Sequence, residues 1–353
     1  MKASHLGRPV IGALIAVGML AGCGVLQQTQ NEAPPNGMQG SVPQETLRRP
    51  MPQGTWVPRS PRGPKRAGWL LSAAKVPGGR LLYVSEDYVY SDGAVIIYPE
   101  KGNHQSPIGM ITAGVEDPWG LYVDKQQNLY VANQGGTVTV YPRGSTSPSL
   151  TFSQGLGRPL YPIVDSSGDV FVSNAGRSYT TSRGSSGGGM VVEYRPGSTS
   201  SYRVLQTPGA EADGMAFDRQ GDLYVAYRDS AGTGSIEEFA PGSTQGTILG
   251  MSLNRPQGVI VDNNGNIVVV ETRGSDRIDF FPPGQQTPSV EIPANVPNQL
   301  AIRRTEPRLF IASEAGYIYG IRYHFLRKHP RAYVKEELDS VVQGVALSNG
   351  QRF

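Results

Sequence analysis

The chain has 353 residues, enough for one large domain with a shared core. Its formal net charge is +3, and it is +1 without Lys2 and Arg8, which lie in an N-terminal segment expected to be cleaved. So small a charge excludes the basic surface of a nucleic-acid-binding protein. With 45 glycines, 28 prolines and no helical periodicity after residue 23, the composition excludes a helical fold and is typical of an all-β protein.

Residues 1–22 have the organisation of a signal peptide: a charged start, an apolar run over 9–19 that is too short to span a bilayer, and small residues before a cleavage site. The segment Leu20-Ala-Gly-Cys23 resembles the bacterial lipobox, in which the cysteine carries acyl chains such as palmitate and becomes the mature N-terminus. Cys23 is the only cysteine, and a lone thiol in an oxidising compartment is otherwise a liability. Gly24, rather than Asp, follows it, which by resemblance to sorted lipoproteins favours the outer membrane of a Gram-negative cell. The alternative is an ordinary signal peptide with a chance cysteine.

Residues 23–68 are rich in Pro, Gln, Gly and Asn and poor in apolar side chains, which predicts a disordered tether. Its second half is basic. Those charges either solvate a spacer or attract anionic headgroups or wall polymer.

A block that recurs over residues 69–353 predicts the fold. Pro118–Asn133 and Pro256–Glu271 both contain an apolar strand, an Asp-led turn, a second apolar strand and a polar end. Weaker copies give equivalent positions 41–53 residues apart, which is the spacing of propeller blades: Gly120, Tyr161, Gly214, Gly258, Gln299, Gly344. A third strand ending in a Pro/Gly turn and a fourth apolar run follow in each copy. Six second strands are visible: Leu81–Ser85, Leu129–Ala132, Val170–Ser173, Leu223–Ala226, Ile267–Val270, Leu309–Ala312. We therefore predict a six-bladed β-propeller of four-stranded antiparallel blades.

The ring needs closure, because an open propeller exposes two sheet edges. Gly344–Gly350 copies the first strand and turn of a blade without the strands that follow, so it is expected to complete the first blade beside Leu81–Ser85. Trp69–Ala73 precedes Leu81 at a similar spacing and is a rival for the same place.

The pattern P-x-G-V-x-V-D-x-x-G-N-I-x-V-V-E-x-x-x-x-D-R-I-x-x-F over Pro256–Phe281 resembles the NHL repeat, and Pro118–Asn133 carries its first half. The resemblance implies the propeller fold. It leaves the function open, because this superfamily includes interaction propellers, sugar-lactone hydrolases with a channel-bound divalent metal, and streptogramin and peptide-amidating lyases.

The acids that open the first-to-second-strand turns are expected to accept backbone N–H groups within their own turns: Asp124, Asp165, Asp218, Asp262. The candidate binding residues end the second strands, on the opposite face: Glu86, Asn133, Asn174, Tyr227, Glu271, Ser313. Four of them, Glu86, Asn133, Asn174 and Glu271, supply oxygen ligands suited to Ca²⁺ or another divalent metal. The alternative is that these side chains cap their own loops.

Loops between blades add further residues on that face: Trp119, Arg158, Tyr161, Glu211, Asp213, Arg255, Asn298. Trp119 either stacks on a sugar or peptide or plugs the channel. Residues 175–189 form the longest loop there, either a lid or a tolerated insertion.

None of the three histidines of the mature chain falls among these positions, so a lyase base is missing, and zinc chemistry is disfavoured. We therefore expect no resident cofactor and no catalytic residue. The predicted protein is a monomeric binding scaffold for an envelope protein, peptide or glycan, held at the membrane by a lipid anchor. The alternative is a divalent-metal-dependent hydrolase resembling the sugar-lactonase propellers, supported by the four candidate metal ligands.

Overall fold

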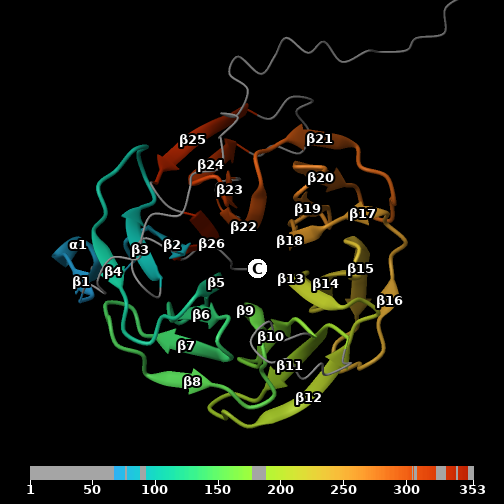
Figure 1. Ribbon diagram of the computed structural model, residues 1–353, viewed down its shortest axis with the longest axis horizontal. Helices are drawn as coiled ribbons and strands as arrows, with labels where there is room; N and C mark the ends of the chain where they lie inside the picture. Colours follow the sequence, from blue (N-terminus) through green and yellow to red (C-terminus); the bar gives the residue numbers. More distant parts are fainter. Residues whose placement is uncertain are drawn as a thin grey trace, which may run out of the picture. The chain divides into compact units, whose positions relative to one another are not determined.

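The computed structural model describes residues 67–75, 78–87, 93–176, 188–303, 305, 308–322, 331–338 and 341–348. Six antiparallel sheets stand around a central axis, with the first strand innermost in blades 2 to 6 and β26 innermost in blade 1 (Figure 1), so the predicted six-bladed propeller is confirmed. The described residues contain one short helix, α1 (Ser72–Lys75), and no helix there is long and apolar enough to cross a membrane. The predicted signal peptide, Cys23 and most of the tether lie outside the described residues.

Blades 2 and 3 are each formed by four consecutive strands, whereas blade 1 combines strands from both ends of the chain. Blade 1 contains β1 (Trp69–Leu70), β2 (Leu81–Asp87), β3 (Ala94–Pro99), β4 (Gly109–Ile111) and β26 (Val341–Leu347). Blade 2 contains β5 (Pro118–Val123), β6 (Leu129–Asn133), β7 (Thr137–Tyr141) and β8 (Leu150–Phe152). Blade 3 contains β9 (Pro159–Val164), β10 (Val170–Asn174), β11 (Met190–Tyr194) and β12 (Ser201–Gln206).

Blades 4 to 6 repeat the arrangement. Blade 4 contains β13 (Glu211–Phe217), β14 (Leu223–Arg228), β15 (Thr233–Phe239) and β16 (Thr247–Ile248), and the short β17 (Leu253–Asn254) also pairs with β15. Blade 5 contains β18 (Pro256–Val261), β19 (Ile267–Glu271), β20 (Arg277–Phe281) and β21 (Val290–Pro293). Blade 6 contains β22 (Pro297–Arg303), β23 (Arg308–Ser313), β24 (Tyr317–Arg322) and β25 (Arg331–Glu337).

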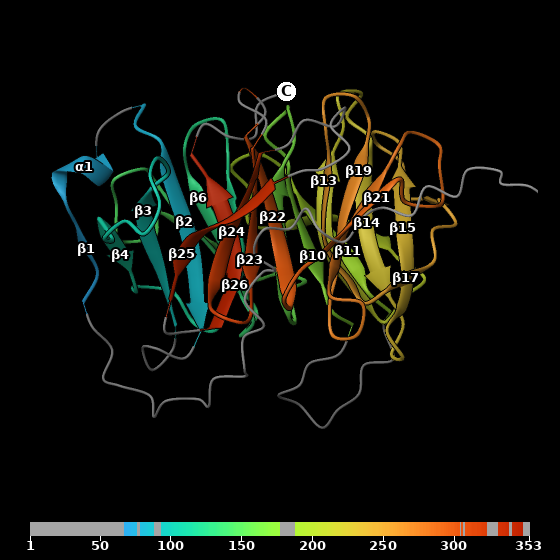
Figure 2. The ribbon, with the colours of Figure 1, turned by 90° about the horizontal axis from the view of Figure 1, so that it is seen from above.

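The C-terminal strand closes the ring. β26 pairs with β2 as the innermost strand of blade 1, with Gly344 opposite Ser85. The rival segment takes a different place: β1 pairs with β4 at the outer edge of the blade, and α1 lies beside it on the rim (Figure 2). The ring is therefore closed by main-chain pairing between strands from opposite ends of the chain.

Each neighbouring pair of blades shares a large cluster of buried apolar side chains, and a seventh, smaller cluster lies between blades 2 and 3 in the described part of the chain. β19 shows how one strand serves two of them. Ile267 and Val269 pack toward blade 4, whereas Val268 and Val270 pack toward blade 6. Because successive side chains of a strand point to opposite faces, a strand buried on both faces has to be continuously apolar, as this run is.

The Asp-led turns have the predicted structure. Asp262 Oδ1 accepts hydrogen bonds from the backbone N–H groups of Asn264, at 2.8 Å, and Asn266, at 2.9 Å. The other three acids accept the N–H four residues on through the same atom. We call the side of the ring that carries these turns the turn face, and the side that carries the second-to-third-strand loops and the blade connections the loop face.

Candidate functional site

Three of the four predicted metal ligands bond the loop that leads into their own blade. Asn133 Oδ1 accepts a hydrogen bond from the Glu116 N–H at 3.0 Å, and Asn133 Nδ2 donates to the Gly114 carbonyl at 3.2 Å. Asn174 Oδ1 accepts from the N–H groups of Gly157, at 3.2 Å, and Arg158, at 2.9 Å.

The same contact recurs in blades 5 and 6. Glu271 Oε2 accepts from the Asn254 N–H at 2.6 Å, and Ser313 Oγ donates to the Asn295 carbonyl. The four side chains therefore fasten each incoming loop at a nearly constant separation of 16 to 19 residues. We call these contacts the loop latches.

Glu271 has further partners. Its Oε1 lies 3.0 Å from the Arg277 guanidinium, and its neighbour Asp279 is fully buried. Burial, with the hydrogen bond to Glu271, raises the pKa of Asp279 to about 8. Burial would also raise the pKa of Glu271, but hydrogen bonds from Asp279, the Asn254 N–H and Arg277 outweigh it and lower that pKa. Near neutral pH Asp279 therefore keeps its proton and Glu271 is the charged member of the pair.

Glu86 is buried and the ring of Tyr227 is half-buried. Within the described ranges, no group of three Asp, Glu, His or Cys side chains is placed to hold one metal ion. The predicted divalent-metal site, whose set includes two asparagines, stays a prediction.

A different set of residues lines the loop-face end of the central channel. It contains one residue from each first strand, directly before the repeated glycine position, in blade order: Gln343, Trp119, Leu160, Asp213, Gln257, Asn298. All six are buried. We call this set the channel ring.

The next position along each first strand is the waist of the channel, and four of its six residues are glycine. A Cβ at Gly120 would lie 2.3 Å from Tyr161 Cδ1, and a Cβ at Gly214 would lie 2.3 Å from the Gln257 carbonyl oxygen. Gly258 and Gly344 would likewise meet the first strand of the next blade, at 2.8 and 2.3 Å. Glycine at this position therefore lets neighbouring strands approach closely.

Tyr161 and Gln299 occupy the other two waist positions. The Tyr161 hydroxyl, from blade 3, donates a 2.7 Å hydrogen bond to Asn298 Oδ1 of blade 6, on the opposite side of the ring. Asn298 Nδ2 in turn donates to Gln343 Oε1 at 2.7 Å. Gln299 Nε2 donates to the Leu121 carbonyl at 2.8 Å, which joins blade 6 to blade 2. Burial raises the pKa of Tyr161 well above its usual value, so its hydroxyl stays protonated. Tyr161 is thus a strut across the channel.

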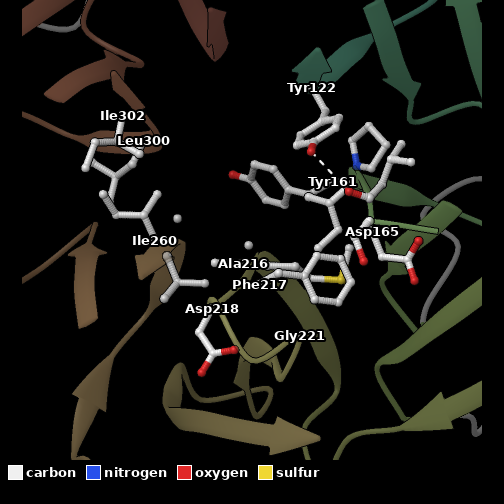
Figure 3. Close-up of a pocket in the computed structure, with 18 of the residues that line it drawn as sticks. Tyr122, Tyr161, Asp165, Ala216, Phe217, Asp218, Gly221, Ile260, Leu300 and Ile302 are labelled. Atoms are coloured by element: carbon white, nitrogen blue, oxygen red, sulfur yellow. Dashed lines mark hydrogen bonds between the residues drawn. The ribbon is translucent and has the colours of Figure 1, made fainter. Parts of the chain in front are cut away.

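Below the strut, on the turn face, lies a cavity of about 690 Å³. Figure 3 shows Ile260, Leu300 and Ile302 on one wall facing Tyr122 and Tyr161 on the other. The Tyr122 hydroxyl is held away from the cavity's apolar wall by a 3.1 Å hydrogen bond to the Val164 carbonyl. The polar groups at this end belong largely to the Asp-led turns.

On the loop face lies a smaller cavity of about 210 Å³, which we call the upper cavity. It is lined by Trp119, Leu160 and Gln257 of the channel ring and by a collar of charged residues: Arg158, Glu211, Arg228, Asp229, Arg255, Arg273. Its lining is therefore far more polar than that of the turn-face cavity.

Three of the six collar residues, Arg158, Glu211 and Arg228, are tied into one chain of ion pairs. Arg158 Nε donates to Gln134 Oε1 at 2.7 Å and lies 3.7 Å from Glu211 through its terminal nitrogen. Arg228 binds Glu211 through its terminal nitrogen, and its Nε lies 3.0 Å from Asp213 Oδ2. Burial raises the pKa of Asp213 to about 7, although Arg228 opposes the shift.

The local sequence explains why Arg228 reaches this place. In four blades the first strand begins with proline, which has no N–H to extend the ladder: Pro118, Pro159, Pro256, Pro297. Blade 4 has Ala212 there instead, and the ladder extends by one pair, Glu211 with Arg228. The missing proline is the signal by which Arg228 could have been found.

Trp119, Arg158, Glu211 and Arg255, which the sequence predicts on this face, come together at the upper cavity. Arg228, Gln257 and Arg273 also line it and were not predicted. Trp119 has only 7% of its surface exposed, so it packs at the end of the channel and offers no open face for stacking. Residues 177–187, the bulk of the long loop of blade 3, lie outside the described residues.

No family model and no curated protein matches the chain. Among solved structures, the propeller of Dos1 is similar over 74% of this chain and 69% of its own, at 10% identity and a TM-score of 0.47. A gluconolactonase from Xanthomonas campestris is similar over 72% of this chain and 95% of its own, at 17% identity and a TM-score of 0.49.

Proposed function

We propose that the chain is a non-catalytic binding propeller that holds a protein, peptide or glycan at its loop face. The observation that carries the proposal is the upper cavity, a polar hollow ringed by four arginines at the loop-face end of a channel closed below by Tyr161. Convergent polar groups in a concavity are the usual mark of a binding site. The NHL-like repeat supports the same reading, because interaction propellers carry it.

A binding test follows from the place of Ser230, an exposed residue at the edge of this cavity. We expect the full mature chain to be retained by some members of a peptide and oligosaccharide array, and Ser230→Trp to abolish retention by filling the cavity. Ser200→Trp, an exposed position in the β11–β12 turn on the other face, is the matched control and should bind normally. Equal retention of both variants would place the ligand elsewhere.

The hydrolase alternative is tested with Ca²⁺. A metal that binds only the folded state raises the melting temperature with its concentration. We expect no rise at millimolar Ca²⁺, because Asn133, Asn174 and Glu271 serve as loop latches. A Ca²⁺-dependent rise that disappears in Glu271→Ala and persists in Ser313→Ala would favour the hydrolase, since both variants lose a latch and only one loses a carboxylate.

We further propose that Cys23 is lipidated and that residues 24–68 tether the propeller to the outer membrane or its equivalent in the cell envelope. Several acyl chains, at about 0.8 kcal/mol per buried CH₂, give durable anchoring. Mass spectrometry of the mature N-terminus should find acylated Cys23. Cys23→Ser should move the protein from the membrane to the soluble fraction. An unmodified, soluble wild-type chain would refute the anchor.

A further inference from the structure

We propose that the upper cavity binds the carboxyl-terminal end of a peptide, with Arg255 holding the carboxylate and Gln257 accepting a hydrogen bond from the last peptide N–H. This rests on the binding function proposed above and names the ligand group.

Arg255 is the arginine of the collar that is available for an anion. Arg158 and Arg228 share Glu211, and Arg273 lies 3.1 Å from Glu314, whereas Arg255 has no ion-pair partner among the described side chains. A guanidinium presents a planar fork of donors that fits a carboxylate with two parallel hydrogen bonds. An unpaired guanidinium in a hollow therefore selects this group.

The backbone places Arg255 at the entry to blade 5. It precedes β18 with a φ of 50°, a left-handed conformation that Asp117 and Val296 share directly before β5 and β22, so this geometry belongs to the blade entry. A Cβ at Gly232 would lie 2.8 Å from Arg255 Cγ, so the glycine makes room for the arginine side chain.

Gln257 supplies the second half of the site. It lies two residues beyond Arg255, and both residues line the upper cavity. Only 1% of Gln257 is exposed, and its Oε1 has no hydrogen-bond partner in the described part of the chain. A buried acceptor left unpaired is unfavourable, so a ligand N–H that donates to it contributes to binding.

The volume of the upper cavity favours the end of a peptide chain over a complete small molecule. At about 210 Å³ the cavity is smaller than most small-molecule pockets, which are about 300–1,000 Å³. Asp229 and Ser230 are exposed at the same mouth, so the remainder of a chain can leave over them. Because Trp119 is buried, it offers no stacking face for a sugar, and this favours a peptide over a glycan.

The test uses N-acetyl-Ala-Ala as the free acid and as its carboxyamide, with the full mature chain, by calorimetric titration and thermal melting. We expect the acid to bind and to raise the melting temperature, and the amide to bind at least tenfold more weakly. Arg255→Gln and Gln257→Leu should each weaken the acid at least tenfold. Gln257→Leu should melt no lower than wild type, since it removes an unpaired acceptor. Arg219→Gln, on the turn face, is the control and should bind the acid normally.

Several outcomes would overturn the proposal: no binding of the acid at 20 mM, equal affinity for acid and amide, or no effect of Arg255→Gln. Binding of galacturonate in place of the peptide acid would overturn the peptide assignment. An array ligand that Ser230→Trp abolishes and Arg255→Gln leaves unchanged would retain the binding function and reject the carboxylate site.

Discussion

Glu237 shows what a single buried carboxyl does to this molecule. It lies in β15 with 6% of its surface exposed, and its Oε2 has no hydrogen-bond partner among the residues described. Burial raises its pKa to about 7. The unfolded chain ionises this group near pH 4.3, so between about pH 4 and 7 the folded state binds the extra proton. The contribution of protonated Glu237 to the free energy of unfolding is fully present below about pH 4, and it is lost as the pH rises through 7.

We therefore predict that Glu237→Gln flattens the fall in stability between pH 5 and pH 8.5, because glutamine never ionises. The measurement is urea denaturation at both pH values. Glu291→Gln, whose side chain is 51% exposed, is the control and should keep the pH dependence of wild type. An equal fall in the free energy of unfolding between the two pH values for wild type and Glu237→Gln would contradict the raised pKa of Glu237.

The loop latches act at the scale of the strand and the loop it receives. They explain why polar residues end second strands in four blades: each side chain replaces a main-chain partner that the incoming loop lacks. Their function is to fix the loops from which the collar of the upper cavity is built. Asn174, for instance, holds the N–H of Arg158, a collar residue.

We predict that Asn174→Leu destabilises the protein by about 1–3 kcal/mol, because the N–H groups of Gly157 and Arg158 both lose their acceptor, whereas Asn174→Asp retains most of the stability. Denaturant titration measures the change, and hydrogen exchange at Gly157 and Arg158 should accelerate in the leucine variant alone. Unchanged exchange there would mean that the latch does not hold the loop.

The waist glycines give a second prediction at this scale. Gly120→Ala should destabilise by about 1–3 kcal/mol, since its Cβ would lie 2.4 Å from the Leu160 carbonyl oxygen and neither strand can move without disturbing a sheet. Gly157→Ala is the matched control, because nothing lies within 4 Å of its Cβ, and should stay within about 0.5 kcal/mol of wild type. Equal denaturation midpoints for the two variants would contradict close strand approach at the waist.

At the scale of the whole molecule, closure depends on contacts between the two ends of the ring. β26 supplies main-chain pairing, and Arg303 of blade 6 forms a buried two-point ion pair with Glu100 of blade 1. Arg303 also donates to the Ser348 carbonyl at 2.9 Å, directly after β26. Ser348 Oγ accepts from the Leu81 N–H at 2.7 Å. One arginine thus joins blade 6, the closing strand and the first blade.

We predict that Arg303→Leu destabilises the protein by about 3–5 kcal/mol, because the buried Glu100 carboxylate is left without its partner. Arg303→Leu with Glu100→Leu should recover part of the loss. Arg273→Leu removes an ion pair whose arginine side chain is 54% exposed, and should cost less than about 1 kcal/mol. Guanidinium denaturation measures all three, and a double variant no more stable than the single would argue against the buried pair.

The fold could be predicted from the sequence because a strand buried on both faces must be continuously apolar, as Ile267–Val270 is, and because such strands recur at blade spacing. The same regularity did not show which residues converge. Asn133 and Glu271 occupy equivalent positions and looked like convergent ligands, yet their latch partners lie 17 residues earlier, in the segments that lead into their blades. Arg228 reaches the collar because the first strand of blade 4 has no proline at its start, and Gln257 lines the cavity because it directly precedes a waist glycine. Both placements depend on how neighbouring strands pair, which the sequence alone does not show.

The Tyr161 strut has one more consequence. Since the Tyr161 hydroxyl of blade 3 reaches Asn298 of blade 6, this side chain separates the upper cavity from the turn-face cavity. A ligand of the upper cavity therefore enters and leaves on the loop face. Substitutions in the turn-face cavity should leave the specificity of the upper cavity unchanged.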